Sequence, residues 1–370
     1  MLGLYIHIPF CKQKCYYCDF FSVKYDVVLV NKYVDALIKH ASQFRNQKIN
    51  SIYIGGGTPS VLSLKQLEKL LQTLNNIFDL SEVREFTFEL NPESTSKEKL
   101  RLLKNFGINR LSIGLQSVED NSLKFLGRIH DFQTFCNIYD IARKESFNNI
   151  NIDLIYGLSN QTVKEWERDL KRALLFNSEH LSLYPLSIEE GTPFYLNSVT
   201  INDNIQRDMY DKAVEVLASN GYAHYEISNW TKRSRESFHN SNYWRNFEYI
   251  GLGAGAAGYL RKIRYKNIDD IEKYIAVCSL LKDVQSRCGN ISSLEMESEY
   301  IGDELYKTEK IILGLRLLNE GIDVNCFNSS EHQTVLLECL KDKTLEQDND
   351  AIKLSKEFIF VFNQIVSKFM

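Results

Sequence analysis

The feature that most constrains the fold is an alternation of short apolar strands and amphipathic helices over about the first 220 residues. Residues 27–44 and 64–74, for example, repeat leucine and other apolar residues at helical spacing. Strand–helix repetition predicts a parallel sheet covered by helices, so the fold class is α/β. Six units of this kind fit either an open doubly wound sheet or a partial barrel. The six predicted strands are residues 4–8, 51–54, 85–90, 110–115, 150–155 and 180–185.

Distinctive residues gather at the carboxyl ends of these strands. Cys11 follows the first strand, a Gly-Gly-Gly run at residues 55–57 follows the second, and Glu89 ends the third. Gln116 follows the fourth strand and Asp153 lies in the fifth. Both candidate architectures bind their ligands at that edge of the sheet. The sequence therefore predicts one site built from several strands.

The pattern changes after residue 222 and again near residue 300. Residues 224–230 fit a single strand, and a polar loop follows it. We predict a barrel-type domain at 1–222, a connecting segment at 223–299 and a smaller C-terminal α+β domain at 300–370. In the last part, helices at 305–318 and 331–340 precede a polar hairpin at 344–354. Asn349 and Asp350 suit the turn of that hairpin. This order of elements resembles a winged helix.

Charge and hydropathy exclude some classes of protein. Forty-four basic residues against 48 acidic ones give a formal charge of −4, which argues against a generally basic nucleic-acid surface. No window approaches the run of about 18 apolar residues that a membrane-spanning helix needs. The first residues have neither a basic region nor a signal-peptide cleavage site. We expect a cytoplasmic protein with no transmembrane segment and no nucleic-acid partner.

Three of the eight cysteines, Cys11, Cys15 and Cys18, lie within eight residues of one another in a C-x3-C-x2-C pattern. Thiols this close normally bind a metal or perform redox chemistry. Three thiolates could hold three irons of a [4Fe–4S] cluster and leave the fourth iron open, although ordinary electron-transfer clusters use four cysteines. Zinc held by the same cysteines and His7 is the alternative. The other five cysteines, at 136, 278, 288, 326 and 339, are isolated and receive no role.

Several blocks in order resemble the radical S-adenosylmethionine (SAM) proteins. The blocks are residues 5–20, 55–60, 88–92, 107–117, 126–128 and 151–158. Within that superfamily they are similar to the branch that contains oxygen-independent coproporphyrinogen III dehydrogenase and HemW-type haem chaperones. The resemblance runs from residue 2 to about residue 260, and more weakly to the end. It implies a partial (β/α)6 barrel and favours iron–sulfur over zinc.

The resemblance also implies roles for individual residues. Cys11, Cys15 and Cys18 would bind the cluster, and its open iron would bind the amino and carboxylate groups of SAM. Ser187 is a weaker candidate near the same site. Residues at positions that match SAM contacts in the family are Tyr5, Tyr17, Gly56, Gly57, Thr58, Glu89, Gln116, Arg128 and Asp153.

Two departures separate the chain from the dehydrogenase. That enzyme resembles C-x3-C-x2-C-x-C, whereas the last position here is Phe20. It also has several dozen residues before the cluster motif, which here begins at residue 11. Both departures match HemW-type proteins and favour a chaperone without coproporphyrinogen dehydrogenase activity.

A His-Asn-x-x-Tyr-Trp segment is the second discriminator, and it resembles a HemW-type motif associated with haem. It consists of His239, Asn240, Tyr243 and Trp244. Neutral imidazole is a good axial haem ligand, and the two aromatic rings offer flat apolar faces to a porphyrin. Basic residues that could pair with the haem propionates are Lys232, Arg233, Arg235 and Arg245.

The resulting expectation is a HemW-like haem chaperone that binds [4Fe–4S], SAM and haem and delivers haem to apo-haemoproteins. Its partners would also include an electron donor for the cluster. One alternative is oxygen-independent coproporphyrinogen III dehydrogenase, which decarboxylates propionates through a SAM-derived radical. A second alternative is a zinc-binding interaction module.

Overall fold

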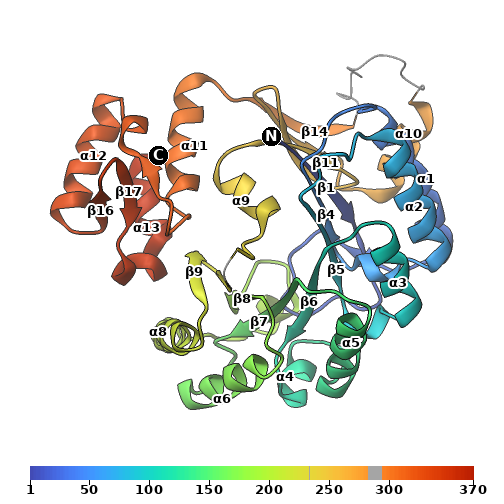
Figure 1. Cartoon of the computed structure of the whole chain (residues 1–370), viewed down its shortest axis with the longest axis horizontal. Coiled ribbons are helices and arrows are strands. Elements are labelled where there is room, and N and C mark those ends of the chain that lie inside the picture. Colours follow the sequence, from blue (N-terminus) through green and yellow to red (C-terminus); the bar gives the residue numbers. More distant parts are fainter. Residues whose placement is uncertain (233, 282–293) are drawn as a thin grey trace.

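A computed structural model describes residues 1–232, 234–281 and 294–370. Its main feature is a curved sheet of 12 strands in the order β14-β13-β12-β11-β1-β4-β5-β6-β7-β8-β10-β9. The seven consecutive strands β11, β1, β4, β5, β6, β7 and β8 are parallel to one another. Antiparallel strands extend the sheet beyond β8 and beyond β11. Figure 1 shows the main helices of the first 220 residues along the convex face of the sheet.

The six predicted strands are all present. They are β1 (Leu2–Ile8), β4 (Ser51–Gly56), β5 (Glu85–Leu90), β6 (Arg110–Gln116), β7 (Ile150–Tyr156) and β8 (His180–Pro185). The helices that follow them are α1 (Val27–Ser42), α2 (Leu64–Ile77), α3 (Lys97–Asn105), α4 (Asp120–Phe125), α5 (Phe132–Lys144), α6 (Val163–Leu174), α7 (Pro193–Leu196) and α8 (Asp203–Ser219). The sheet does not close, so the predicted α/β partial barrel is confirmed.

Local sequence explains where the helices begin. Ser63 and Gln66 form a capping box at α2, and Thr162 and Glu165 form one at α6. Ser96 accepts a hydrogen bond from the third residue of α3, as its position before the helix predicts. Each cap satisfies backbone N–H groups that have no partner inside the helix.

The barrel strands have one apolar face and one polar face. In β1, Leu4, Ile6 and Ile8 are fully buried in the core between sheet and helices. Because strand side chains alternate between faces, Tyr5 and His7 lie on the opposite, inner face. The core is therefore the layer between the sheet and its helices, and the interior of the barrel is free to be polar.

Residues 223–300 extend the large sheet. They contain β9 (Ala223–Glu226), β10 (Asn229–Thr231), α9 (Phe238–Trp244), β11 (Glu248–Leu252), β12 (Ala257–Leu260), β13 (Ile263–Asn267), α10 (Ile271–Leu280) and β14 (Glu295–Tyr300). The single strand expected near residues 224–230 is a hairpin instead. The backbone N–H of Ser228 donates to the Glu226 carboxylate at 2.8 Å, which closes the turn between β9 and β10.

The C-terminal part contains α11 (Asp303–Gly314), α12 (Ser330–Lys341) and α13 (Phe362–Val366). Its small sheet has β17 (Ala351–Leu354) between β15 (Ile322–Asp323) and β16 (Leu345–Asp348). The β16–β17 hairpin turns at Asn349, whose φ is 54°, so the predicted hairpin is present. Figure 1 places this part beside β9 and α9. The division at residues 222 and 299 stays a prediction.

Candidate functional site

A cavity of about 530 Å³ lies inside the barrel and extends from the cysteine loop to α9. Ser187 and Asn240 also line it. Predicted cluster and SAM residues that line the cavity are Cys11, Cys15, Cys18, Tyr17, Gly56, Gly57, Thr58, Glu89, Gln116, Arg128 and Asp153. The fold therefore brings these predicted residues to one place, as the strand-end argument required.

The cysteine loop is held against neighbouring segments by backbone and side-chain contacts. Short strands β2 (Phe10–Cys11) and β3 (Val23–Lys24) pair in parallel around it. Thr58 donates a hydrogen bond to the Cys11 sulfur at 3.4 Å, and Arg128 donates one to the Cys15 sulfur at 3.5 Å. Burial raises the pKa of Cys18 to about 11 and also raises the pKa of Cys11. Thiolates here need a positive partner, and Arg128 and the irons of a cluster are of that kind.

His7 lies close to the cysteine loop but has other partners. Its Nδ1 is 2.8 Å from the Tyr5 hydroxyl, and its Nε2 is 2.9 Å from the Phe21 carbonyl. Both ring nitrogens are thus occupied in hydrogen bonds, and burial lowers the pKa of the ring. A Cys3His zinc site would have to break one of these hydrogen bonds. Three cysteines without His7 therefore fit the iron–sulfur prediction better than the zinc alternative.

The glycine run forms a surface without side chains beside the cysteines. Gly56 has a φ of 113°, and a Cβ there would lie 2.6 Å from the His7 ring. A Cβ on Gly57 would lie 2.9 Å from the backbone nitrogen of Phe10 and 3.1 Å from the Cys11 sulfur. Only glycine fits at both positions, which leaves backbone close to the cavity. This arrangement suits the amino-acid end of SAM.

Two carboxylates lie in the cavity wall. Glu89 accepts hydrogen bonds from the Tyr53 hydroxyl at 2.6 Å and from the Gly56 N–H at 3.2 Å. Burial, with the nearby charge of Asp153, raises the pKa of Glu89 to about 7. Burial also raises the pKa of Asp153, which accepts hydrogen bonds from Asn151 at 2.7 Å and Ser112 at 3.1 Å. Carboxylates with raised pKa in a cavity are typical of a functional site.

Gln116 and Arg128 lie at the rim of the cavity, where the parallel strands end near the cysteine loop. Gln116 has a φ of 68° at a bulge in the pairing of β6 with β7. Strained non-glycine residues of this kind persist where the surroundings hold them, often at functional sites. Arg128 also donates to the Asn91 side chain at 2.7 Å and to the Gly114 carbonyl at 3.2 Å. Its guanidinium is thus fixed beside the cysteine loop.

Tyr5 is the predicted SAM residue that lies behind the cavity wall. Its hydroxyl contacts His7, and its ring centre is 6.3 Å from that of Tyr53. It can support the glycine run through His7. A direct contact with SAM stays a prediction.

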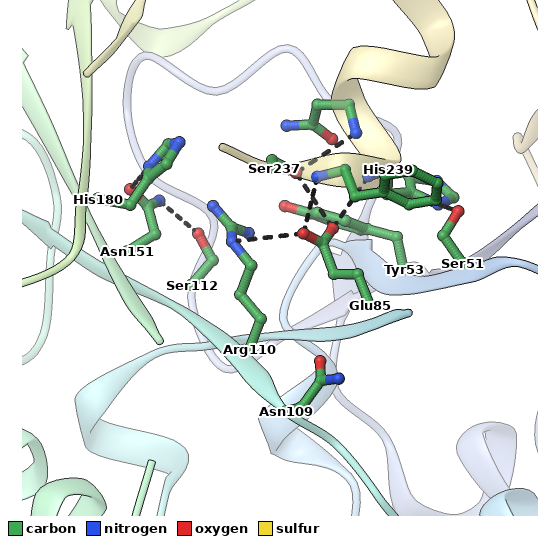
Figure 2. Close-up of polar contacts among 12 residues, drawn as sticks. Ser51, Tyr53, Glu85, Asn109, Arg110, Ser112, Asn151, His180, Ser237 and His239 are labelled. Atoms are coloured by element: carbon green, nitrogen blue, oxygen red, sulfur yellow. Dashed lines mark hydrogen bonds and ion pairs between the residues drawn. The ribbon is translucent and has the colours of Figure 1, made fainter. Parts of the chain in front are cut away.

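The predicted haem-associated segment forms α9, which lies over the starts of β4 and β5 at the inner end of the barrel. Figure 2 shows His239 beside Ser51 and Tyr53. His239 is 1% exposed, with Nδ1 2.8 Å from the Ser51 hydroxyl and Nε2 2.7 Å from the Tyr243 hydroxyl. Burial lowers its pKa to about 3, so the ring is neutral. Tyr243 packs on Tyr249 with ring centres 4.5 Å apart. Axial ligation of haem by His239 would require both the burial and a hydrogen bond to be lost.

Trp244 and the basic residues near α9 also have partners within the protein. Trp244 lies under the guanidinium of Arg316, 4.1 Å from its ring centre. Of the basic residues considered for propionates, Arg245 pairs with Glu320, and Lys232 donates to the Asn177 carbonyl at 3.0 Å. Arg235 is exposed, whereas Arg233 lies outside the described residues. Among the four predicted haem residues, only Asn240 lines the cavity.

Sequence reasoning missed a set of polar residues in the same cavity. The sequence does contain a signal for them. Parallel strands buried on both faces are normally apolar throughout, whereas these strands alternate polar and apolar residues, which indicates a polar inner face. The missed residues that line the cavity include Tyr53, Arg110, Ser112, Asn151, Ser182 and Tyr184.

Comparisons with known proteins agree with this geometry. Residues 5–173 match the radical SAM superfamily. The chain is 36% identical to the heme chaperone HemW of Lactococcus lactis subsp. lactis (strain IL1403) over 99% of this chain and 96% of that protein. It is 38% identical to HemW of Bacillus subtilis (strain 168), over 74% of this chain and 75% of that protein.

A solved structure shows the same fold. Coproporphyrinogen III oxidase (HemN) from Escherichia coli, a radical SAM enzyme, has a TM-score of 0.84 and 21% identity. The match covers 100% of this chain and 89% of that chain. In the described ranges, no helix has the length and apolar character needed to cross a membrane.

Proposed function

This chain belongs to the HemW family of radical SAM proteins, and from that premise we propose that it is a haem chaperone that delivers haem to acceptor proteins. Membership implies a [4Fe–4S] cluster, SAM and haem as its ligands. The observation that carries the proposal is the convergence of three cysteines, a glycine cradle and two carboxylates of raised pKa on one cavity. We also propose a cytoplasmic location and an electron donor for the cluster. The seven described cysteines are free thiols, as expected in a reducing compartment.

The residues of the chain have separable tasks in this proposal. Cys11, Cys15 and Cys18 would hold three irons, and Arg128 offsets negative charge on the thiolates. Gly56 and Gly57 let backbone approach the amino-acid end of SAM, while Glu89 provides a carboxylate for its ammonium group. The bound cluster would supply one electron to the SAM sulfonium; the protein orients and encloses the two.

Phe20 bears on the dehydrogenase alternative. It lines the cavity and is 65% exposed, at the position where the dehydrogenase pattern has a fourth cysteine. A phenyl ring there cannot serve as a metal ligand or a thiol reactant. It does offer an apolar face beside the cysteine loop. This supports a chaperone over a coproporphyrinogen dehydrogenase.

The test uses the full chain, reconstituted anaerobically with iron and sulfide, as wild type, Cys15→Ser and Cys136→Ser. Cys136 lies on α5 away from the cavity, so its variant is the matched control. We expect wild type and Cys136→Ser to hold a cluster, to bind haem saturably near one per chain by Soret absorbance, and to pass it to apomyoglobin. Cys15→Ser should lose iron. Consumption of coproporphyrinogen III without saturable haem binding would replace the proposal with the dehydrogenase.

A further inference from the structure

Arg110 is a buried cation inside the barrel with unused hydrogen-bond donors. It begins β6, is 1% exposed and lines the cavity. Its Nε and Nη1 atoms have no hydrogen-bond partner among the described residues. A guanidinium is always charged, and leaving its N–H groups unpaired in a buried place is costly. The described part of the chain therefore leaves these two Arg110 nitrogens without a hydrogen-bond acceptor, which a bound ligand could supply.

The nearest carboxylate, Glu85, is already used by α9. It accepts hydrogen bonds from the Ser237 hydroxyl at 3.2 Å, the Phe238 N–H at 2.8 Å and the His239 N–H at 3.1 Å (Figure 2). Its Oε2 lies 4.0 Å from the Nε of Arg110, which is within ion-pair range but too long for a hydrogen bond. Glu85 thus partly balances the charge of Arg110 without satisfying its donors.

The other nearby polar groups are paired among themselves. Asn151 donates to Asp153 and to Ser112, both at 2.7 Å, and Ser112 donates to Asp153 at 3.1 Å. Ser182 and His180 lie 3.1 and 2.6 Å from the side-chain oxygen of Asn151. This network holds the wall beside Arg110 rigid and makes no hydrogen bond to it. Arg110 is thus the one cavity-lining cation near this wall with open donors in the described part of the chain.

The position differs from the predicted SAM site. Gln116, at the rim, is six residues further along the same strand, which corresponds to about 20 Å. The amino-acid end of a SAM molecule beside the cysteines therefore lies at the opposite end of β6 from Arg110. The part of the cavity between Arg110 and Asn240 of α9 is continuous with the predicted SAM site and offers room for a further ligand group at its other end. The charge of Arg110 also acts on Glu89 and Asp153, which line the same cavity.

We propose that Arg110 binds a carboxylate group of a ligand that occupies the inner end of the cavity. The planar guanidinium offers paired donors that match a carboxylate. The carboxylate could belong to a propionate side chain of haem, which rests on the proposed function, or to a free small carboxylate. Both sources share one chemistry, and they differ in the size of the molecule that carries the group.

The first experiment needs no substitution. Wild-type protein is titrated with haem and with haem dimethyl ester, and separately its thermal unfolding is followed with propionate and with neutral propionamide. If Arg110 binds a haem propionate, haem should bind roughly 10- to 100-fold more tightly than the ester. If it binds a free carboxylate, propionate should raise the melting temperature and propionamide should not, while haem and ester bind alike.

Variants assign the effect to Arg110. Arg110→Met should abolish the preference for the carboxylate form, Arg110→Lys should keep part of it, and Arg101→Met, on an exposed arginine of α3, should leave it unchanged. Equal binding of haem and ester together with no propionate effect in wild type would overturn the proposal, as would a preference that survives in Arg110→Met. If wild type binds no haem at all, the chaperone proposal fails, but the propionate arm still decides the role of Arg110.

Discussion

Two carboxylates in the cavity, Glu89 and Asp153, have raised pKa values because their charged forms are poorly solvated. Both side chains are partly buried in the cavity wall, and for both the largest cause of the raised pKa is loss of solvation. The hydrogen bonds from Tyr53, Gly56, Ser112 and Asn151 offset that effect only in part. Carboxylates in this state bind a positive group such as an ammonium or sulfonium favourably, because the ligand restores the missing counter-charge.

Glu89→Gln should change the pH dependence of stability in the ligand-free protein. The pKa of Glu89 is about 7 in the folded protein against an ordinary value of 4.5, so the folded state keeps a proton that the unfolded chain loses. Stability from this group therefore falls as pH rises from 4.5 to 7. The loss between about pH 5 and pH 8 amounts to about 2–3 kcal/mol, which the variant should lack.

Urea unfolding at several pH values measures this effect, with Glu68→Gln on the exposed side of α2 as control. The control should keep the wild-type pH dependence. An unchanged slope in Glu89→Gln would show that Glu89 is ionised throughout this range. In the same variant, SAM should bind more weakly at pH 8, because the carboxylate that would meet its ammonium group is gone.

Gly56→Ala tests whether the glycine run beside the cysteines tolerates one added Cβ atom. The new Cβ would meet the His7 ring at 2.6 Å and would also sit at a φ of 113°. Backbone strain and overpacking together should cost about 2–4 kcal/mol and reduce SAM binding. Gly107→Ala is the matched control, since Gly107 has a φ of 84° and nothing within 4 Å of its Cβ position. Equal losses in thermal stability would mean that backbone strain alone matters.

At the scale of elements, the position of helix α9 depends on a carboxylate of strand β5. Glu85, the first residue of β5, accepts hydrogen bonds from three successive residues at the start of this short helix. A seven-residue helix is marginal by itself, so these bonds and the packing of His239 on Tyr53 keep it in place. The inner end of the cavity thus has the geometry that β5 imposes on α9.

Glu85→Gln should loosen α9 and leave the charge of Arg110 uncompensated. Breaking one partner of a buried pair costs about 3–5 kcal/mol. The double variant Glu85→Gln with Arg110→Met removes the stranded charge and should recover part of that loss. Denaturant unfolding of the four proteins in this cycle measures the coupling, and strictly additive losses would contradict it.

The alternation of strands and helices was enough to predict six of the seven parallel strands, because these strands have a continuous apolar face and several helices have a cap such as Ser63 or Thr162. The cysteine loop, the glycine run and Glu89 were likewise readable from the sequence and do line the cavity. The sequence predicts one strand where the hairpin β9–β10 lies, because the turn depends on a tertiary detail, the hydrogen bond from the Ser228 N–H to the Glu226 carboxylate. The burial of His239 could not be predicted, since its partner Ser51 is 188 residues away in sequence.

At the scale of the whole molecule, Arg316 joins the C-terminal part to the barrel. Its guanidinium lies 3.4 Å from the carboxylate of Glu226 on β9 and 4.1 Å from the ring centre of Trp244 on α9. Phe362, on α13, packs on the same guanidinium at 5.4 Å. Beside it, the Leu318 N–H donates to the Tyr225 carbonyl at 3.0 Å. One cation therefore contacts the edge of the large sheet, the helix at the inner end of the cavity and the C-terminal helices.

Arg316→Met should weaken this junction, because Glu226 is fully buried and would lose its cation. Breaking one partner of a buried pair costs about 3–5 kcal/mol. Burial already raises the pKa of Glu226, and without Arg316 that pKa rises further. The folded state then holds a proton more firmly than the unfolded chain, so the loss of stability should be larger at pH 8 than at pH 5.

Limited proteolysis and urea unfolding at both pH values measure the junction. Cleavage in Arg316→Met should concentrate in residues 300–370, because the Arg316 guanidinium is one of the contacts that attach this part to β9 and α9. Lys353→Met is the control, because it breaks an exposed ion pair with Asp348 inside the same part and should cost less than about 1 kcal/mol. If both variants lose the same stability and are cleaved alike, Arg316 is not what holds the two parts together. If only Arg316→Met also loosens haem binding, the C-terminal part acts on the cavity through Trp244 and α9.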